Sequence, residues 1–228
     1  MPTVEMTYRE ALRTCIVEEM DADQNVFVMG EDIGRYQGTF RVTQGLFDKF
    51  GPKRIIDTPI VEPGFTGIAI GAAMTGLRPI VELMFIDFSL VAMDPLLNQI
   101  AKTRYMSGGR ASAPMVIRTQ GGGYKGAASQ HSQMLEALFL HVPGIKVVTP
   151  SSPQEAHDLL IASIRDPDPV LFIEHKQLYP VKGEVIPTET KLGQAKVTRQ
   201  GRDLTVVSYS YCHQLALEAA EQLGSKGV

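Results

Sequence analysis

Only two cysteines occur in the sequence, Cys15 and Cys212, and neither belongs to a C-x-x-C pair. This distribution indicates neither a disulfide framework nor a zinc site, and it fits a reducing compartment. No basic run occurs either, and the net charge is −3. Scattered lysines and arginines of this kind do not favour nucleic acid or an anionic membrane as a partner.

Long hydrophobic runs are also missing. The longest uncharged apolar stretch, residues 64–77, is too short and too rich in glycine to span a bilayer. The first twelve residues are polar and show no signal-peptide pattern. We therefore expect a cytoplasmic protein that has no membrane partner.

Several common catalytic patterns are absent. The sequence has no G-x-S-x-G, no phosphate-binding loop ending in GK[ST], and no histidine pair at metal-ligand spacing. These absences argue against a serine hydrolase, a P-loop enzyme and a histidine-based metal site.

What the sequence does contain is a regular alternation of short apolar segments with helical patterns. Of the 228 residues, 44% are hydrophobic, so the chain can bury a substantial core. The alternation predicts an α/β fold with a doubly wound parallel sheet. Strands are expected at 25–30, 54–57, 80–85, 115–119, 145–149 and 169–174. Helices are expected at 7–21, 45–50, 64–77, 88–106, 132–140 and 153–164.

The pattern thins after residue 176 into a polar connector that contains prolines. We expect one domain over residues 1–185, a linker over 186–202, and the beginning of a second domain over 203–228. That second part contains a predicted strand at 204–209 and a predicted helix at 212–223. One strand and one helix cannot bury a core, so this domain is incomplete within the sequence.

Glu62 is a candidate catalytic residue. It precedes Pro63, which suits the first helical position, so Glu62 is expected near the helix N-cap. The simplest role for such a carboxylate is to stabilise the helix dipole. However, its neighbours are apolar or small, and a carboxylate in an apolar cleft is a functional-site candidate.

His131 is the second candidate, in the stretch AASQHSQ. We expect it to open a helix, whose N-terminus would lower the pKa of the imidazole and keep it available for proton transfer. Before it, Gly121, Gly123 and Gly126 form a G-x-G-x-x-G pattern. The acidic residue that should end the next strand of a dinucleotide site is missing, so a flexible loop near a site is the better interpretation.

Other candidates are expected at the same edge of the sheet. Phe85 and Phe88 lie where a strand ends and a helix begins, and Glu31 follows the first strand. Ligands of α/β sheets bind at the carboxyl ends of strands, where an aromatic ring can stack on a flat heterocycle. No phosphate-binding motif accompanies them. These residues therefore suggest one half of a ligand site, which binds an uncharged ring while another element holds a phosphate.

Several motifs resemble one family in combination. They are GEDIG, DTPIVEPGFTGIAIGAAMTGLRPIVELMF, AKTRYMSGG, AASQHSQ and SIRDPDPVLFIE, and together they extend over essentially the whole chain. They resemble the beta subunit of thiamine-diphosphate-dependent 2-oxo acid dehydrogenases, which include the pyruvate, branched-chain and acetoin dehydrogenases. The resemblance implies a transketolase-like pyrimidine-binding domain followed by the start of a transketolase C-terminal domain.

The resemblance also implies roles for individual residues. Glu62 matches the glutamate that hydrogen-bonds the aminopyrimidine ring of the cofactor. His131 matches the histidine that serves substrate protonation and acyl transfer to lipoyl. The cofactor-binding residues implied in addition are Ile60, Met84, Phe88 and Glu31. The resemblance also implies a loop for a monovalent cation such as K⁺ at Met115, Ser163, Ile164, Asp166 and Asp168, although Pro167 and Asp168 replace residues that often bear amides in relatives.

An alpha subunit is implied as partner, in an α2β2 heterotetramer that places thiamine diphosphate at the interface, with the alpha subunit holding Mg²⁺ and the diphosphate. A lipoyl-bearing acyltransferase core is the second implied partner. ELMFIDF and VIRT favour an acetoin-like enzyme, whereas GRYQGTFRVTQGL favours a pyruvate-like one. Two alternatives are a fragment of a single-chain transketolase or deoxyxylulose-phosphate synthase, and a non-enzymatic nucleotide-binding module built on the glycine loop.

Overall fold

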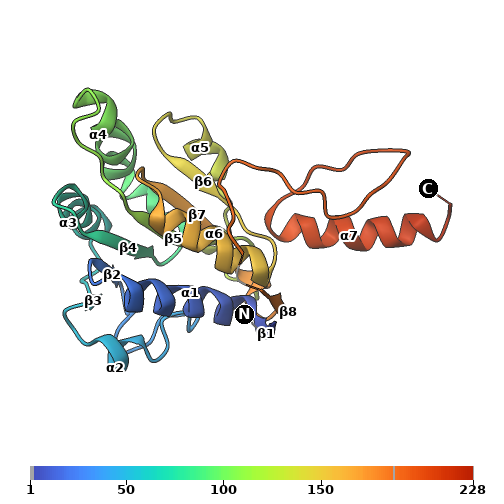
Figure 1. The fold of residues 1–228 in the computed structure, drawn as a ribbon, viewed down its shortest axis with the longest axis horizontal. Helices are drawn as coiled ribbons and strands as arrows, with labels where there is room; N and C mark the ends of the chain where they lie inside the picture. The colour runs from blue at the N-terminus through green and yellow to red at the C-terminus, as the bar shows by residue number, and fades with distance from the viewer. Residues whose placement is uncertain (1–2, 187, 228) are drawn as a thin grey trace.

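A six-stranded parallel sheet forms the centre of the molecule (Figure 1). The structure is a computed structural model that describes residues 3–186 and 188–227. The strand order is β3-β2-β4-β5-β7-β6, and every neighbouring pair is parallel. The strands are β2 (Val26–Gly30), β3 (Ile55–Asp57), β4 (Arg78–Leu83), β5 (Val116–Gly121), β6 (Lys146–Val148) and β7 (Val170–His175). The predicted α/β class and parallel sheet are confirmed.

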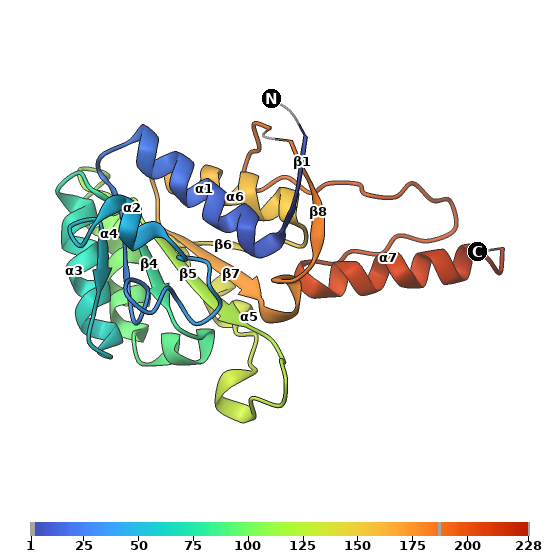
Figure 2. The ribbon, with the colours of Figure 1, turned by 90° about the horizontal axis from the view of Figure 1, so that it is seen from below.

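Helices cover both faces of this sheet. Figure 2 shows α1 (Tyr8–Ala22) and α6 (Pro153–Arg165) on one side and α3 (Glu62–Met74) and α4 (Ala101–Met106) on the other. Alternate strand residues supply the two cores. Val28 and Ile80 pack with α1 and α6, whereas their neighbours Met29 and Val81 pack with α3. Both faces are therefore buried, as a parallel sheet requires.

The start of α1 follows directly from local sequence. The Thr7 side chain accepts a hydrogen bond from the backbone N–H of Glu10, and the Glu10 carboxylate accepts one from the backbone N–H of Thr7. This reciprocal capping box satisfies two backbone donors that the helix leaves unpaired.

The helix predicted over residues 88–106 forms only in part, because helical structure is continuous only from residue 93 to 106 and much of it is not α-helical. The chain instead forms a 3₁₀ turn η1 (Ile86–Leu90), a π-helical segment η2 (Asp94–Ile100) and the short α4. Pro95 lies in the first turn of η2, where a backbone N–H would have no partner within the helix, so it fits the start of this later helical segment. The helix expected at 132–140 is also shorter, because only α5 (Glu136–Leu140) is α-helical. The short helix α2 (Leu46–Phe50) forms where it was expected.

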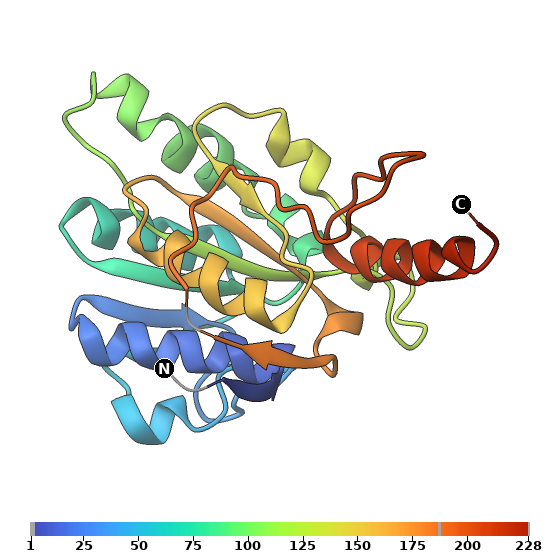
Figure 3. The ribbon, with the colours of Figure 1, turned by 45° about the vertical axis from the view of Figure 1, so that its right-hand side comes forward.

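Two strands outside the main sheet were not predicted. β1 (Val4–Thr7) and β8 (Lys182–Val185) pair antiparallel, and Figure 3 shows them side by side in dark blue and orange. A 3₁₀ turn η4 (Lys176–Leu178) connects β7 to this pair. β8 ends at Val185, and the division of the chain into domains stays a prediction.

The strand predicted at 204–209 is wrong, since these residues form no strand before α7 (Ser210–Gly224). Val206 and Val207 are 60% and 92% exposed, so they have no sheet against which to pack. A strand needs a partner strand, and the described residues offer none here. None of the helices in the described part of the chain combines the length and apolar character that crossing a membrane demands.

Candidate active site

Residues from five segments converge at the edge of the sheet where the parallel strands end. Glu31 follows β2, α3 begins after β3, and η1 follows β4. The glycine loop follows β5, and η4 follows β7. All these connections leave from the same edge because the strands are parallel, and this edge is where ligands bind in such sheets.

Glu62 lies in the first turn of α3. It is the first helical residue, with Val61 as N-cap and Pro63 in the second position, so the helix includes Glu62 itself and begins two residues before the predicted bound at 64. Its side chain is only 6% exposed. No side chain among the described residues donates a hydrogen bond to it. A buried carboxyl with free acceptor capacity at a helix N-terminus can hold a donor supplied by a ligand.

Glu31 lies beside Glu62 and is equally buried. Its Oε1 atom has no hydrogen-bond partner in the described structure. Burial, and then the nearby carboxylates of Glu62, Asp32 and Glu82, raise the pKa of Glu31 to about 7. Like charges in a buried site disfavour ionisation. Glu31 can therefore keep a proton near neutral pH, beside the carboxyl of Glu62, and exchange it with a bound group.

Close packing of strands β2 and β4 fixes the position of Glu31. Gly30 pairs with Glu82 in the ladder, and a Cβ atom on Gly30 would lie 2.5 Å from the Glu82 backbone oxygen. Only glycine fits there, because the obstacle is backbone. Glycine at this position allows the end of β2 to pack closely against β4, and this packing places the next residue, Glu31, in the site.

A buried ion network lies directly behind these carboxyls. Arg118 is fully buried and binds Glu174 through Nε and Nη2 at 2.6 and 2.8 Å. Its Nη1 atom donates to Glu82 at 2.7 Å. Burial alone would lower the pKa of Arg118, but the Glu174 and Glu82 carboxylates raise it overall. Since Glu82 is one of the carboxylates that raise the pKa of Glu31, this network contributes to the electrostatics of the site.

Aromatic rings surround His131 on a second side of the site. Its ring centroid lies 4.7 Å from that of Phe85 and 5.4 Å from that of Phe88, both in edge-to-face geometry. Phe88 is half-buried, so part of its ring remains available to a ligand. His131 ends a three-residue 3₁₀ turn, η3 (Ser129–His131), and does not open an α-helix as predicted. The helix N-terminus that was expected at His131 is therefore replaced by this short turn.

Two residues hold the His131 turn in place. Lys176 is buried, and its Nζ atom donates a hydrogen bond to the backbone oxygen of His131. The same Nζ atom lies 4.8 Å from the ring centroid of Phe85. Burial lowers the pKa of Lys176, while the charge of Asp87 opposes this effect. Asp87 also accepts a hydrogen bond from the Gln133 side chain at 2.7 Å.

The remaining predicted cofactor-binding residues lie at the same edge with different exposure. Met84 is half-buried at the end of β4. Ile60 is 76% exposed in the turn just before Glu62. The exposed apolar side chains Val61, Ile68 and Met74 lie further along the same segment and α3. This exposed surface borders the buried carboxyls.

The glycine loop does not form a dinucleotide fingerprint. Gly121 ends β5, and Gly122 has a φ of 83° and packs against the ring of His175. The loop leads into η3 and not into an α-helix, so it lacks the helix N-terminus on which a pyrophosphate would rest.

The predicted cation ligands lie at the opposite edge of the sheet. Met115 immediately precedes β5, and residues 163–168 form the end of α6 and the turn into β7. They are therefore separate from Glu62 and His131.

Sequence reasoning missed Lys176 and the Glu82–Arg118–Glu174 network. A signal for the network was present, because each of these charges follows apolar residues within a strand of the buried parallel sheet. A buried charge requires a partner, so three charged residues on neighbouring buried strands could have been matched. Lys176 gave no such signal, since its role depends on a turn 45 residues earlier.

Comparisons with known proteins give a consistent result. The sequence profile described as "Transketolase, pyrimidine binding domain" matches residues 4–182. The chain is 49% identical over 230 residues to "Pyruvate dehydrogenase E1 component subunit beta-2, mitochondrial" of Oryza sativa subsp. japonica, covering 98% of this chain but 61% of that protein. It is 48% identical over 227 residues to "Pyruvate dehydrogenase E1 component subunit beta" of Rickettsia felis, covering 99% of this chain and 70% of the relative.

A solved structure shares the fold. The chain matches "Split gene transketolase, inactive beta4 tetramer" with a TM-score of 0.80 at 22% sequence identity. The match covers 98% of this chain and 69% of that one. At this identity the likeness concerns the fold alone.

Proposed function

The chain belongs to the family of pyruvate dehydrogenase E1 beta subunits and contains their transketolase pyrimidine-binding domain, and we propose that it forms the pyrimidine-binding half of a thiamine-diphosphate-dependent 2-oxo acid dehydrogenase. The proposed substrate is pyruvate or a similar 2-oxo acid, and the acyl acceptor is a lipoyl group. An alpha subunit completes the site in an α2β2 assembly and holds Mg²⁺ and the diphosphate. The whole complex includes a lipoyl-bearing acyltransferase core.

The buried Glu31–Glu62 pair is the observation that carries this proposal. An aminopyrimidine ring is uncharged and presents nitrogen donors and acceptors, so it matches carboxyls that share a proton. The unpartnered Oε1 atom of Glu31 and the free acceptor capacity of Glu62 fit such a ring. Glu62 holds the ring nitrogen, and Glu31 keeps a proton beside it because its pKa is about 7.

Three apolar side chains complete the ring pocket in this proposal. Phe88 offers a half-exposed aromatic face, and Met84 and Ile60 cover the remaining sides. They exclude water from the carboxyl pair, which strengthens the hydrogen bond between Glu62 and the ring. Thiamine diphosphate, when bound, supplies the nucleophilic carbon and the electron sink for decarboxylation.

His131 manages protons on the substrate side. Phe85 and Phe88 fix its ring edgewise, and Lys176 fixes its backbone. An imidazole held in this way donates a proton to the substrate and accepts it again during acyl transfer.

Two features of the site support its completion by a partner subunit. The exposed apolar residues Ile60, Val61 and Ile68 border the carboxyl pair and are 76%, 53% and 66% exposed. An apolar surface beside a buried acidic site is typical of an interface. In addition, the glycine loop lacks the helix N-terminus that would bind a diphosphate, so a second chain has to supply that half.

Acetoin is the second candidate substrate. The stretch ELMFIDF, which contributes Glu82, Met84, Phe85 and Phe88 to the site, favours it.

The test is a calorimetric titration of thiamine diphosphate with Mg²⁺ into the purified chain, alone and mixed with a candidate alpha subunit. We expect tight binding only in the mixture. Tight binding to the lone chain would contradict the half-site, because the chain would then need its own diphosphate site. Product analysis of the mixture with pyruvate and with acetoin then separates the two substrates.

A further inference from the structure

The turn between α6 and β7 resembles a monovalent-cation loop, and the structure places protein cations on its oxygen atoms. The implied ligands are Met115, Ser163, Ile164, Asp166 and Asp168. Backbone carbonyl oxygens coordinate K⁺ in proteins, and a hydrogen-bond donor that already faces such an oxygen competes with the cation.

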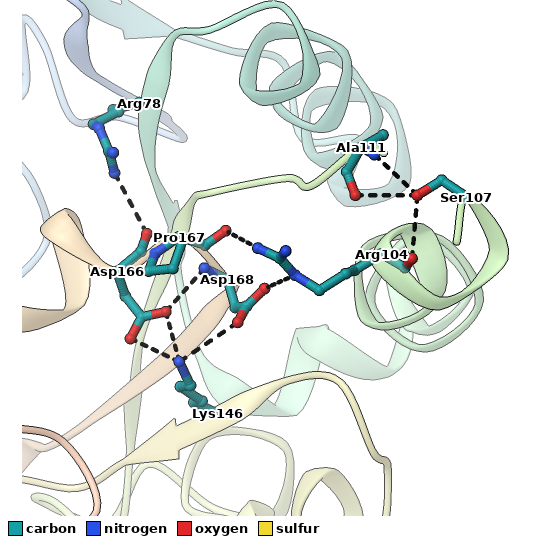
Figure 4. A network of polar contacts seen from close by, with 8 residues as sticks. All are labelled: Arg78, Arg104, Ser107, Ala111, Lys146, Asp166, Pro167 and Asp168. Atoms are coloured by element: carbon teal, nitrogen blue, oxygen red, sulfur yellow. Dashed lines mark hydrogen bonds and ion pairs between the residues drawn. The ribbon is translucent and has the colours of Figure 1, made fainter. Parts of the chain in front are cut away.

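Arg78 faces two of these oxygens. Its Nη1 atom donates to the backbone oxygen of Ile164 at 2.8 Å and to that of Asp166 at 3.4 Å (Figure 4). Arg78 begins β4, so a guanidinium from the sheet reaches the C-terminal end of α6. Positive charge is favoured there because the last carbonyls of a helix have no partners within it.

Two more of the implied oxygens already accept backbone hydrogen bonds. The Met115 oxygen accepts from the N–H of Val170 at 3.0 Å. The Ser163 oxygen accepts from the N–H of Asp166 at 3.3 Å. Four of the five expected ligand positions therefore have a donor from the protein.

The side chains of the turn are neutralised as well. The Nζ atom of Lys146 lies 2.6 and 2.7 Å from the two carboxylate oxygens of Asp166 and 3.7 Å from Asp168. Arg104 binds the Asp168 carboxylate through Nε and the Pro167 oxygen through Nη2 (Figure 4). The Asp168 N–H in turn donates to Asp166 at 2.9 Å.

Three cations, Arg78, Arg104 and Lys146, contact the oxygens of the turn against the two carboxylates of Asp166 and Asp168, while Arg165 is paired with Glu19. A further cation would therefore enter a region that is already positive, and it would have to displace Arg78 from its two oxygens. Arg104, Lys146 and Asp168 also line a cavity of about 700 Å³ beside α4, so ions in solution can reach the turn. Access does not limit cation binding here, and the charge balance disfavours it.

We propose that Arg78 and Lys146 take the place of the monovalent cation in this chain, so that the α6–β7 turn is stable without K⁺. Asp168 fits this arrangement because its carboxylate has Arg104 and Lys146 as partners. The proposal concerns the turn alone and does not depend on the substrate of the enzyme.

The test is thermal unfolding of the purified chain, alone and with its partner subunit, in 100 mM KCl, NaCl or choline chloride. We expect melting temperatures that agree within about 1 °C, since all three salts screen charge equally. A K⁺ site with a Kd of about 1 mM would raise the melting temperature by about 5–10 °C at this concentration. A saturable rise that is specific to K⁺ would therefore overturn the proposal.

A variant pair tests whether Arg78 stabilises the turn. Arg78→Met removes the donor from two oxygens, and we expect it to lower the melting temperature in choline chloride by about 5 °C. Arg35→Met is the control, because the Arg35 side chain is exposed and makes no hydrogen bond to the described residues. Equal melting temperatures for the two variants would overturn the role given to Arg78.

Discussion

The ammonium group of Lys176 donates a hydrogen bond to the backbone oxygen of His131 while it lies over the ring of Phe85. The three residues lie on different loops: Phe85 follows β4, His131 follows β5 and Lys176 follows β7. Lys176 contacts both of the others. The glycine loop before His131 contains Lys125 and Ala128 with φ of 48° and 61°, a conformation that non-glycine residues rarely adopt. An external anchor is therefore needed to keep the imidazole in one place.

Lys176→Met should loosen the His131 turn without removing the imidazole. We expect acyl transfer to lipoyl to fall by about 10-fold, because a misplaced acid–base group loses much of its effect. Lys176→Arg should recover most of the rate, since it keeps a donor. Lys53→Met, at an exposed position, is the control. An unchanged rate in Lys176→Met would rule out the anchoring role.

His131→Ala should slow acyl transfer more than it weakens cofactor binding. General acid–base groups contribute about 100-fold or more to rates, whereas His131 is not expected to contact the pyrimidine ring. Single-turnover reductive acylation measures the first quantity, and calorimetry measures the Kd for thiamine diphosphate. If reductive acylation proceeds at the wild-type rate, His131 has no part in it.

Glu62→Gln should abolish turnover while the cofactor still binds. The amide keeps the size of the side chain but cannot share a proton with the pyrimidine, so we expect a loss of at least about 100-fold. The Kd for thiamine diphosphate should change by less than about 10-fold. Glu5→Gln, at an exposed position near the N-terminus, provides the matched control. Wild-type turnover in Glu62→Gln would refute the role given to this residue.

Glu31 should make the stability of the chain depend on pH. Its pKa is about 7 in the folded chain against an ordinary value of 4.5. Below pH 4.5 both states hold the proton, and between 4.5 and about 7 only the unfolded state releases it. The free energy of unfolding therefore decreases as the pH rises through this window, and levels off above it.

Glu31→Gln removes this decrease because an amide does not titrate. The free energy of unfolding of the variant, relative to that of the wild type, should therefore increase by about 2–3 kcal/mol between pH 4 and pH 8. Urea unfolding at both pH values measures the difference. Glu184→Gln, in which an exposed glutamate is replaced, should instead follow the wild type. Parallel curves for Glu31→Gln and the wild type would show that Glu31 ionises normally.

The parts of the fold that the sequence predicted are those that local patterns determine. Thr7 and Glu10 define the start of α1, and apolar runs such as VFVM identify buried strands. The errors arose where distant partners decide the structure. β1 and β8 have no strong pattern and form because they pair with each other, and residues 204–209 have a strand pattern but no partner.

The candidate site divides in the same way. Glu31 and Glu62 were expected to meet, because strand ends of a parallel sheet share an edge, and both are buried there. The turn that holds His131 was predicted as a helix start, since a short 3₁₀ turn after a glycine loop has no distinct pattern. Lys176 could not be predicted because its role depends on the folded position of a carbonyl group.

The pairing of β1 with β8 also determines when this domain can finish folding during synthesis. Val4 pairs with Val185, so β1 has no partner strand until about 180 further residues have been synthesised. The same holds for α1, which packs against α6. Residues 4–22 therefore remain without their folded partners until the α6–β8 region has been made, and the apolar face of α1 is exposed to non-native contacts during that interval.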